Sequence, residues 1–191
     1  MAADRTAECR SFSVENSIGD NPPLVFTLLK LALFTVLVPG TVTVWLPLFV
    51  LYPTIRHQAI DWNTTAAGAV LVIAIGVSGY LWTALDFAIY GKGTPAPIDM
   101  PKVLVVHGLY RFTRNPMYIS VLCVLLGESL LFYSRALLGY AAIVVVGFNI
   151  FVLIQEEPTL RRKMGPAYEN YCNEVPRWIP KIPRKQRTHA L

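Results

Sequence analysis

Four long apolar stretches, separated by short polar segments, account for most of the chain. They cover residues 24–52, 66–90, 116–133 and 136–155, and a tight turn at Ser134–Arg135 separates the last two. Stretches of this kind are typical of transmembrane helices, which need about 20 apolar residues to cross about 30 Å of hydrocarbon. We therefore predict an all-α fold, a multi-pass bundle of membrane-spanning helices.

The first stretch, Leu24–Tyr52, is the longest and is interrupted at Pro39–Gly40. As one straight helix it would reach about 43 Å at 1.5 Å per residue, yet either part alone is too short to cross about 30 Å. We therefore expect one kinked helix, which gives four transmembrane helices. A helical hairpin, which would give five, stays open.

Charged residues are scarce and unevenly distributed. The 191-residue chain is 54% hydrophobic and 15% charged, whereas soluble domains are about 25% charged. Most of its 17 Lys and Arg residues lie in the N-terminal tail, in the 91–115 loop and in the C-terminal tail. The positive-inside rule places that loop and the C-terminal tail on the cytoplasmic side. The basic excess therefore predicts contact with membrane lipids and no nucleic-acid partner.

The first polar motif, HGLYRFTRNPMY, occupies His107–Tyr118 at the start of the third apolar stretch. Asn115 and Pro116 form the pattern of a helix N-cap followed by a first-turn proline. The unpaired N–H groups of this helix start, beside Arg111 and Arg114, suit an anion. The alternative is that the two arginines only anchor the helix at the lipid headgroups.

The second polar motif begins with two adjacent carboxylates, Glu156 and Glu157, at the end of the fourth stretch. Anions are disfavoured at a helix C-terminus and near anionic headgroups, so we expect these groups to bind the arginines of the first motif or a ligand. A solvated acidic turn is the alternative. Beyond them, apolar and aromatic residues recur every three or four positions and predict one face of an interfacial helical segment that is broken at Gly165–Pro166: Leu160, Met164, Tyr168, Tyr171 and Val175. Simple membrane adhesion is one role for that face.

Three polar residues inside the apolar stretches need an explanation. Asp86 lies near the cytoplasmic end of its stretch, where it either snorkels to the interface or pairs with a basic loop residue. Glu128 is either the ion-pair partner of Arg135 or a functional carboxylate. Asn149 faces the same side as Glu156, about two turns deeper, and is a candidate substrate-binding residue.

Two further features concern metals and oligomers. The three cysteines are isolated and lack a matched histidine spacing, so we predict no metal site. Gly76 and Gly79 permit close helix packing, within one chain or between two, and leave the oligomeric state open.

Taken together, the motifs HGLYRFTRNPMY and EEPTLRRKMGPAYENYCNEVPRWIP resemble the isoprenylcysteine carboxyl methyltransferase superfamily, which includes phospholipid N-methyltransferases. The likeness covers about residues 91–180, and GKGTPAPIDMPKVLVV resembles the bacterial branch. It implies one membrane-embedded domain, 1–191, with a polar tail at 1–23, in a bacterial cytoplasmic membrane. It further implies that S-adenosylmethionine binds on the cytosolic face, with S-adenosylhomocysteine as product, and that the site opens laterally to the bilayer.

The resemblance also implies which residues bind this cofactor. One wall would consist of residues at the start of the third span: His107, Gly108, Tyr110, Arg114, Asn115, Pro116 and Tyr118. Glu156 and Glu157 match the acidic pair that such enzymes need for the cofactor. Tyr168 and Tyr171 match a cover helix, and Val175, Pro176 and Arg177 match a closing segment.

The chemistry of methyl transfer suggests roles for a few of these residues. An in-line displacement gains most from aligned reactants in a dry site. A carboxylate acceptor would need an arginine, Arg114 or Arg177, whereas an amine or a thiol would need a base, for which Glu157 is the nearest candidate. These three are the candidate catalytic residues. The carboxyl methyltransferases typically carry His where this chain has Asn115, so the acceptor, lipophilic or small, stays open.

Two other functions remain as alternatives. Membrane sterol reductases resemble the superfamily in their C-terminal half, and the basic cluster Arg161–Lys163 would suit the 2′-phosphate of NADPH. A non-catalytic membrane scaffold would keep the fold without the chemistry.

Overall fold

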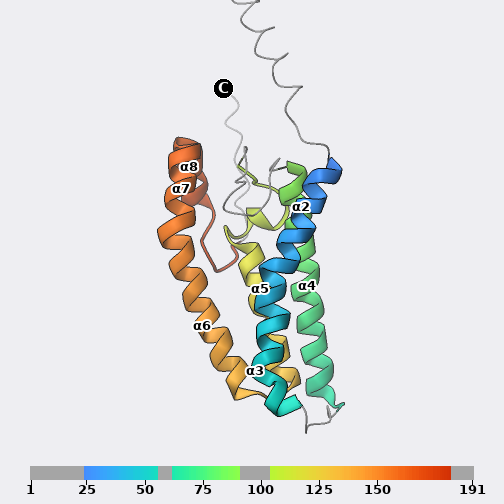
Figure 1. The fold of residues 1–191 in the computed structure, drawn as a ribbon. Coiled ribbons are helices and arrows are strands. Elements are labelled where there is room, and N and C mark those ends of the chain that lie inside the picture. Colours follow the sequence, from blue (N-terminus) through green and yellow to red (C-terminus); the bar gives the residue numbers. More distant parts are fainter. Residues whose placement is uncertain (1–23, 56–61, 91–103, 182–191) are drawn as a thin grey trace, which may run out of the picture.

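The computed structural model of the protein describes residues 24–55, 62–90 and 104–181. Over these ranges it is all-helical and contains no strand, which confirms the predicted fold class (Figure 1). The helices are α2 (Leu24–Leu37), α3 (Leu46–Ile55), α4 (Thr64–Tyr90), α5 (Pro116–Leu131), α6 (Arg135–Phe151), α7 (Glu157–Met164) and α8 (Pro166–Glu174). The predicted tail 1–23 and most of the segment that resembles the bacterial branch lie outside the described residues.

Three helical units in this part of the chain are long and apolar enough to cross a membrane. They are Val25–Val50, Thr64–Tyr90 and Arg135–Met164, the last of which joins α6 and α7. The shorter apolar helix α5 packs beside α4 as the fourth member of the bundle. The four predicted spans are therefore all helices.

The first apolar stretch forms one helix, so the hairpin alternative is wrong. Between α2 and α3 runs a five-residue π-helical segment that starts at Thr41, whose carbonyl accepts the N–H of Leu46. Pro47 has no N–H, so the carbonyl of Val42 lacks its next backbone partner. The hydroxyl of Tyr140 on α6 donates to that carbonyl at 3.0 Å and ties α6 to the first helix.

Small residues bring α4 and α5 into close contact. A Cβ added to Gly76 would lie 2.8 Å from the carbonyl oxygen of Ser120, and one added to Gly79 would lie 2.8 Å from the Ser120 hydroxyl. A Cβ on Gly127 would lie 2.9 Å from the carbonyl oxygen of Ala69. Only glycine permits these separations, so the predicted close packing occurs here within one chain.

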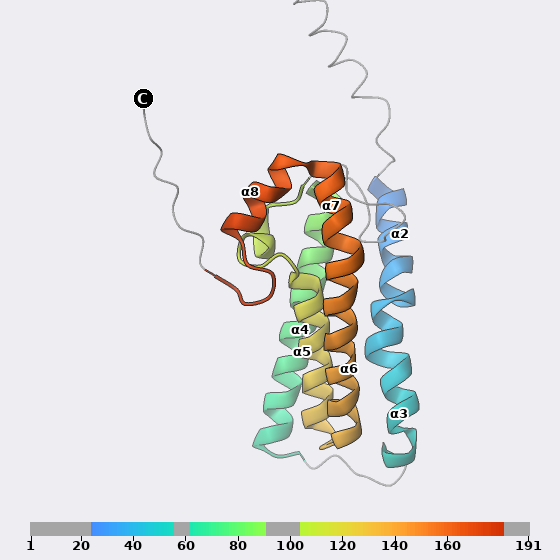
Figure 2. The same cartoon turned by 90° about the vertical axis from the view of Figure 1, so that its left-hand side faces the viewer.

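Both polar motifs gather at one end of the bundle, where α2 and α5 begin and α4 and α7 end (Figures 1 and 2). Gly165, with φ +55°, ends α7 and lets α8 fold back across this end, as the predicted break requires. Tyr168 and Tyr171 of α8, with Val175 directly after it, are buried and pack against residues that include Leu104. The predicted apolar face therefore exists, and it packs against the protein itself.

Of the two alternatives for Glu128, the ion pair with Arg135 does not form. Within the described residues Glu128 has no ion-pair partner, and its buried Oε2 accepts no hydrogen bond. Arg135 begins α6 just after the turn and is exposed.

Candidate functional site

A cavity lies between the helices at the end that carries both motifs. It contains about 1010 Å³ of empty space, a volume that includes solvent at its open mouth. Eight of the residues predicted to bind the cofactor line it: Tyr110, Arg114, Asn115, Tyr118, Glu156, Glu157, Tyr168 and Tyr171. The structure therefore brings together side chains from α5, α7, α8 and the loop before α5.

Glu157 is buried and lies between two arginines. Arg177 donates from Nε to Oε1 at 2.7 Å and from Nη2 to Oε2 at 2.9 Å, while Arg114 donates from Nη1 to Oε1 at 3.1 Å. Charge-assisted pairs of this geometry are strong, and the hydrogen bond to Glu157 raises the pKa of Arg177 above its ordinary value. Both oxygens of Glu157 are therefore engaged within the protein.

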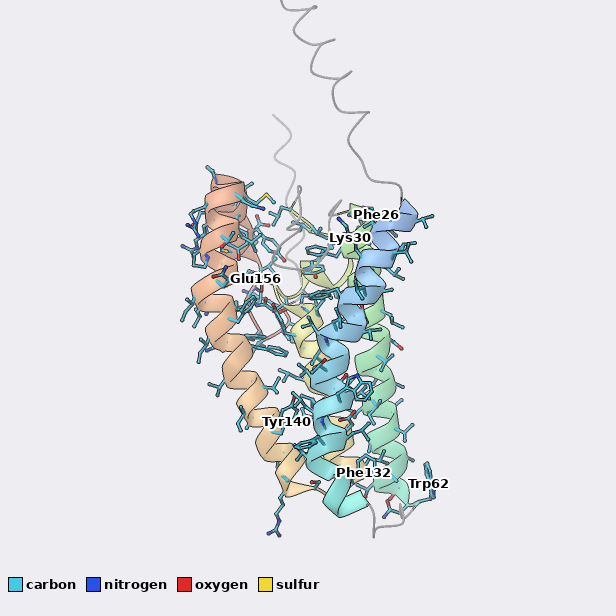
Figure 3. The ribbon with its side chains drawn as sticks, in the orientation of Figure 1. Phe26, Lys30, Trp62, Phe132, Tyr140 and Glu156 are labelled. Carbon is cyan, nitrogen blue, oxygen red and sulfur yellow. The ribbon has the colours of Figure 1, made fainter. Side chains whose placement is uncertain are left out.

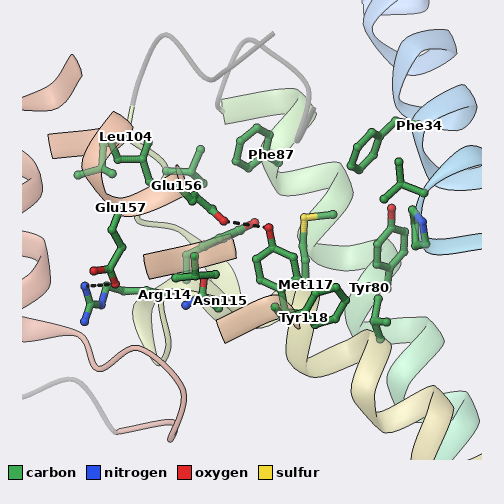
Figure 4. A pocket seen from close by; sticks show the side chains of 18 of the residues that line it. Phe34, Tyr80, Phe87, Leu104, Arg114, Asn115, Met117, Tyr118, Glu156 and Glu157 are labelled. Atoms are coloured by element: carbon green, nitrogen blue, oxygen red, sulfur yellow. Dashed lines mark hydrogen bonds and ion pairs between the residues drawn. The ribbon is translucent and has the colours of Figure 1, made fainter. Parts of the chain in front are cut away.

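Glu156 has a different environment. Its Oε2 accepts a hydrogen bond from the hydroxyl of Tyr118 on α5 at 2.9 Å (Figure 4). No cation of the described residues forms an ion pair with it. Figure 3 shows Glu156 on the side of the α6–α7 helix that faces α2. Among the described acidic residues that line the cavity, Glu156 is the one without an ion-pair partner.

The local helix geometry separates these two neighbours. A second π-helical segment, Val152–Glu156, joins α6 to α7, and the N–H of Glu157 bonds the carbonyl of Val152. Pro158 follows directly and, like the proline after the first π-helical segment, has no N–H. Successive residues of a helix point about 100° apart. Glu156 therefore points to Tyr118, and Glu157 points to the arginines.

The chain after α8 runs back along the loop before α5. Thr113 Oγ1 and Asn115 Nδ2 both donate to the carbonyl of Arg177, at 2.9 and 3.1 Å. Backbone hydrogen bonds also join residues 112–114 to residues 176–181. This segment contains the predicted closing residues, and the loop holds it in place.

The start of α5 differs from the predicted anion site, because Arg114 and Asn115 make contacts within the protein. α5 begins at Pro116 as expected, but the side chain of Asn115 makes no capping hydrogen bond. Arg114 is directed to Glu157, and Arg111 is exposed. The Nε of Arg114 is buried without a hydrogen-bond partner. The donor available in this region is therefore the Arg114 side chain.

Three buried tyrosines, Tyr110, Tyr168 and Tyr171, contribute aromatic rings to the polar side of the cavity. The hydroxyl of Tyr171 donates to the carbonyl of Tyr110 at 2.7 Å, and the rings of Tyr168 and Tyr171 lie 6.2 Å apart. Burial raises the pKa of each phenol above its ordinary value. The three side chains therefore stay neutral and present ring surface to the cavity.

His107, Gly108 and Pro116, three predicted cofactor residues, are not among the lining residues. Nδ1 of His107 lies 3.3 Å from Oδ1 of the buried Asp86, so Asp86 pairs with a loop residue as predicted. Gly108 has φ +52°, and a Cβ there would overlap Oδ2 of Asp86. His107 and Gly108 therefore fasten the loop to the end of α4.

Asn149, the predicted substrate-binding residue, does not line the cavity. Its Oδ1 accepts a hydrogen bond from Nε1 of Trp178 at 3.1 Å. This geometry attaches the closing segment to α6 and gives no support to a role in substrate binding.

Sequence reasoning missed the apolar half of the cavity. Its walls come from the four long helices, among them Phe34, Val38, Pro39 and Val42 from the first helix, Tyr80 and Phe87 from α4, Met117 and Val121 from α5, and Phe148 and Val152 from the α6–α7 helix. Figure 4 shows Phe34 and Tyr80 on the opposite side from Glu157 and Arg114. In a membrane helix, apolar residues face lipid, protein or a cavity alike, so the pattern held no signal for them.

Comparison with known proteins adds one finding. A family model described as phospholipid methyltransferase matches residues 64–167, more than half of the chain. The match runs from α4 into α8 and includes both the His107–Tyr118 motif and the acidic pair. No curated protein and no solved structure matches the chain.

Proposed function

The chain belongs to the phospholipid methyltransferase family, and on that premise we propose that it transfers a methyl group from S-adenosylmethionine to a lipophilic acceptor within the membrane. Membership makes it an integral membrane methyltransferase. The observation that carries the finer proposal is one cavity with a polar side at Glu156 and an apolar side between the long helices.

The polar side suits S-adenosylmethionine, which carries a sulfonium, an amine, a carboxylate and ribose hydroxyls. Glu156 is a carboxylate without a cation, and it suits the amine or the sulfonium. The faces of Tyr110, Tyr168 and Tyr171 suit the sulfonium as well. The unpartnered Nε of Arg114 suits the carboxylate.

The protein contributes alignment and exclusion of water. The cofactor, when bound, supplies an electrophilic methyl group. The tyrosines of α8 cover the polar side, and the apolar walls keep water from an acceptor, so aligned reactants meet in a dry site. For an acceptor that must lose a proton, Glu156 is the available carboxylate, since both oxygens of Glu157 are bound by arginine.

The acceptor has an apolar body and a neutral or basic methylated group. A carboxylate acceptor would need a further free arginine donor, but Arg177 is bidentate on Glu157, and the free Nε of Arg114 is assigned above to the carboxylate of the cofactor. An apolar chain matches the side of the cavity that faces α2. An amine or a thiol at the head of such a molecule would lie beside Glu156.

The orientation belongs to the same proposal. Exposed basic residues, Arg161, Arg162 and Lys163 with Arg111, lie at the end that carries the cavity, and Arg135 lies at the other end. The positive-inside rule then places the site on the cytoplasmic side.

Calorimetric titration of the detergent-purified protein with S-adenosylhomocysteine tests this function, with NADPH and a Glu156→Ala variant in parallel. We expect saturable binding to the wild type that the variant loses. Binding of NADPH in place of S-adenosylhomocysteine would support the reductase. A folded protein that binds neither would support the scaffold.

A further inference from the structure

We propose that the two adjacent carboxylates have different tasks: Glu156 binds the cofactor, and Glu157 is a positioning residue that clasps the C-terminal segment 175–181 over the cavity. This inference rests on the proposed function, because it divides the work of the same site. It reassigns Glu157, which the sequence placed among both the cofactor-binding and the catalytic residues.

Glu157 is surrounded by positively charged side chains. Two guanidinium groups face one carboxylate that is only 6% exposed, and they come from different elements: Arg114 from the loop before α5 and Arg177 from the segment after α8. A third cation would meet a site that already has an excess of positive charge. Glu157 is therefore poorly suited to a sulfonium or an ammonium.

Arg177 joins the C-terminal segment both to Glu157 and to the loop before α5. Its side chain holds Glu157 in bidentate fashion, while its carbonyl accepts from Thr113 and Asn115. Two residues earlier, Val175 packs with Tyr168 and Tyr171, which line the cavity. The Glu157–Arg177 pair thus holds in place the segment against which Tyr168 and Tyr171 pack.

Glu156 differs from Glu157 in that no described cation forms an ion pair with it. Glu156, one position earlier in the chain, lines the same cavity, yet its side-chain partner among the described residues is the neutral hydroxyl of Tyr118. Without a cation nearby, its carboxylate gains most from a positively charged ligand. The neighbours are chemically identical, so the same substitution at each gives a matched pair.

The experiment compares Glu156→Gln, Glu157→Gln and Arg177→Gln in a protein whose other tryptophans, Trp45, Trp62 and Trp82, are replaced by phenylalanine. Trp178 lies in the clasped segment and bonds Asn149, so its fluorescence reports whether the segment is closed. Affinity and dissociation rate are measured with S-adenosylhomocysteine.

We expect Glu157→Gln and Arg177→Gln to shift the Trp178 emission to longer wavelength without ligand and to speed release of S-adenosylhomocysteine. We expect Glu156→Gln to weaken S-adenosylhomocysteine binding by about tenfold or more, as for a lost charged hydrogen bond, and to leave the emission unchanged. The double variant of Glu157 and Arg177 should be no worse than either single variant, because both substitutions open one clasp.

Arg177→Lys is the control for a general loss of folding. It keeps the charge and loses the bidentate geometry, so it should restore part of the slow release that Arg177→Gln loses. Gel filtration in detergent identifies any variant that has not folded, and the lysine variant then takes the place of Arg177→Gln.

One result would overturn the proposal. If Glu157→Gln weakens binding as much as Glu156→Gln does, while Arg177→Gln and the Trp178 emission show no change, Glu157 binds the cofactor directly. If the wild type binds no S-adenosylhomocysteine, the proposed function fails. The emission of the ligand-free variants then still decides whether the clasp exists.

Discussion

At the scale of single residues, the neighbours of a side chain decide its role more than its type does. Glu156 and Glu157 differ by one position and by no chemistry, yet one faces a hydroxyl and the other two guanidinium groups. Likewise Gly108 lies beside the cavity and supports it from outside, because the left-handed φ and the contact with Asp86 both require glycine there.

Gly108→Ala tests this requirement. The added Cβ would overlap the Asp86 carboxylate at a left-handed φ, so we expect a loss of about 1–3 kcal/mol in the free energy of unfolding. Gly139→Ala is the matched control, because nothing lies within 4 Å of a Cβ there, and it should be near neutral. Unfolding in detergent under increasing denaturant measures both. Equal stability of the two variants would contradict the described loop geometry.

At the scale of helices, two π-helical segments place functional groups where a regular helix would not. Each is followed by a proline, Pro47 after the first and Pro158 after the second. The first leaves the carbonyl of Val42 for Tyr140, which joins the first helix to α6. The second ends at Glu156, directly before Glu157 begins α7. Such insertions are frequent at functional sites.

Tyr140→Phe tests the link between α6 and the first helix. Loss of the hydroxyl should cost about 1 kcal/mol of stability, since it leaves the Val42 carbonyl without its donor. Pro47→Ala restores a backbone N–H near that carbonyl, so in its background the same substitution should cost less. A double-mutant cycle on thermal unfolding measures the difference. Strict additivity would show that the proline is not the reason for the link.

At the scale of the whole molecule, the apolar half of the cavity lies between helices that are far apart in the sequence. The first helix lies outside the matched family segment, yet Phe34, Val38 and Val42 from it line the cavity. A chain-bearing acceptor would contact this helix, whereas the residues proposed to bind the cofactor lie near α7 and α8. Binding of donor and acceptor should therefore respond to different substitutions.

Val42→Phe should reduce methyl transfer to membrane lipids and leave S-adenosylhomocysteine affinity unchanged. Overfilling an apolar space costs about 1–3 kcal/mol, which corresponds to roughly five- to 150-fold in turnover. Val44→Phe, on the exposed side of the same helix, is the control. Labelled methyl groups in lipid extracts measure transfer, and calorimetry measures affinity. A parallel loss of both would place the cofactor in this half.

The sequence by itself determined the helices, the break at Gly165–Pro166 and the two motifs, because hydrophobic runs, prolines and glycines act locally along the chain. It also indicated that Asp86 pairs with the loop. Only the tertiary structure decided that Glu157 meets Arg177, that Asn149 meets Trp178, and that Glu128 lacks the predicted Arg135. The first two outcomes join side chains 20 and 29 positions apart, which leave no periodic trace. The third concerns residues on either side of the turn between α5 and α6. The apolar half of the cavity was also decided by the tertiary structure alone, because lipid-facing and cavity-facing residues of a membrane helix have the same apolar composition.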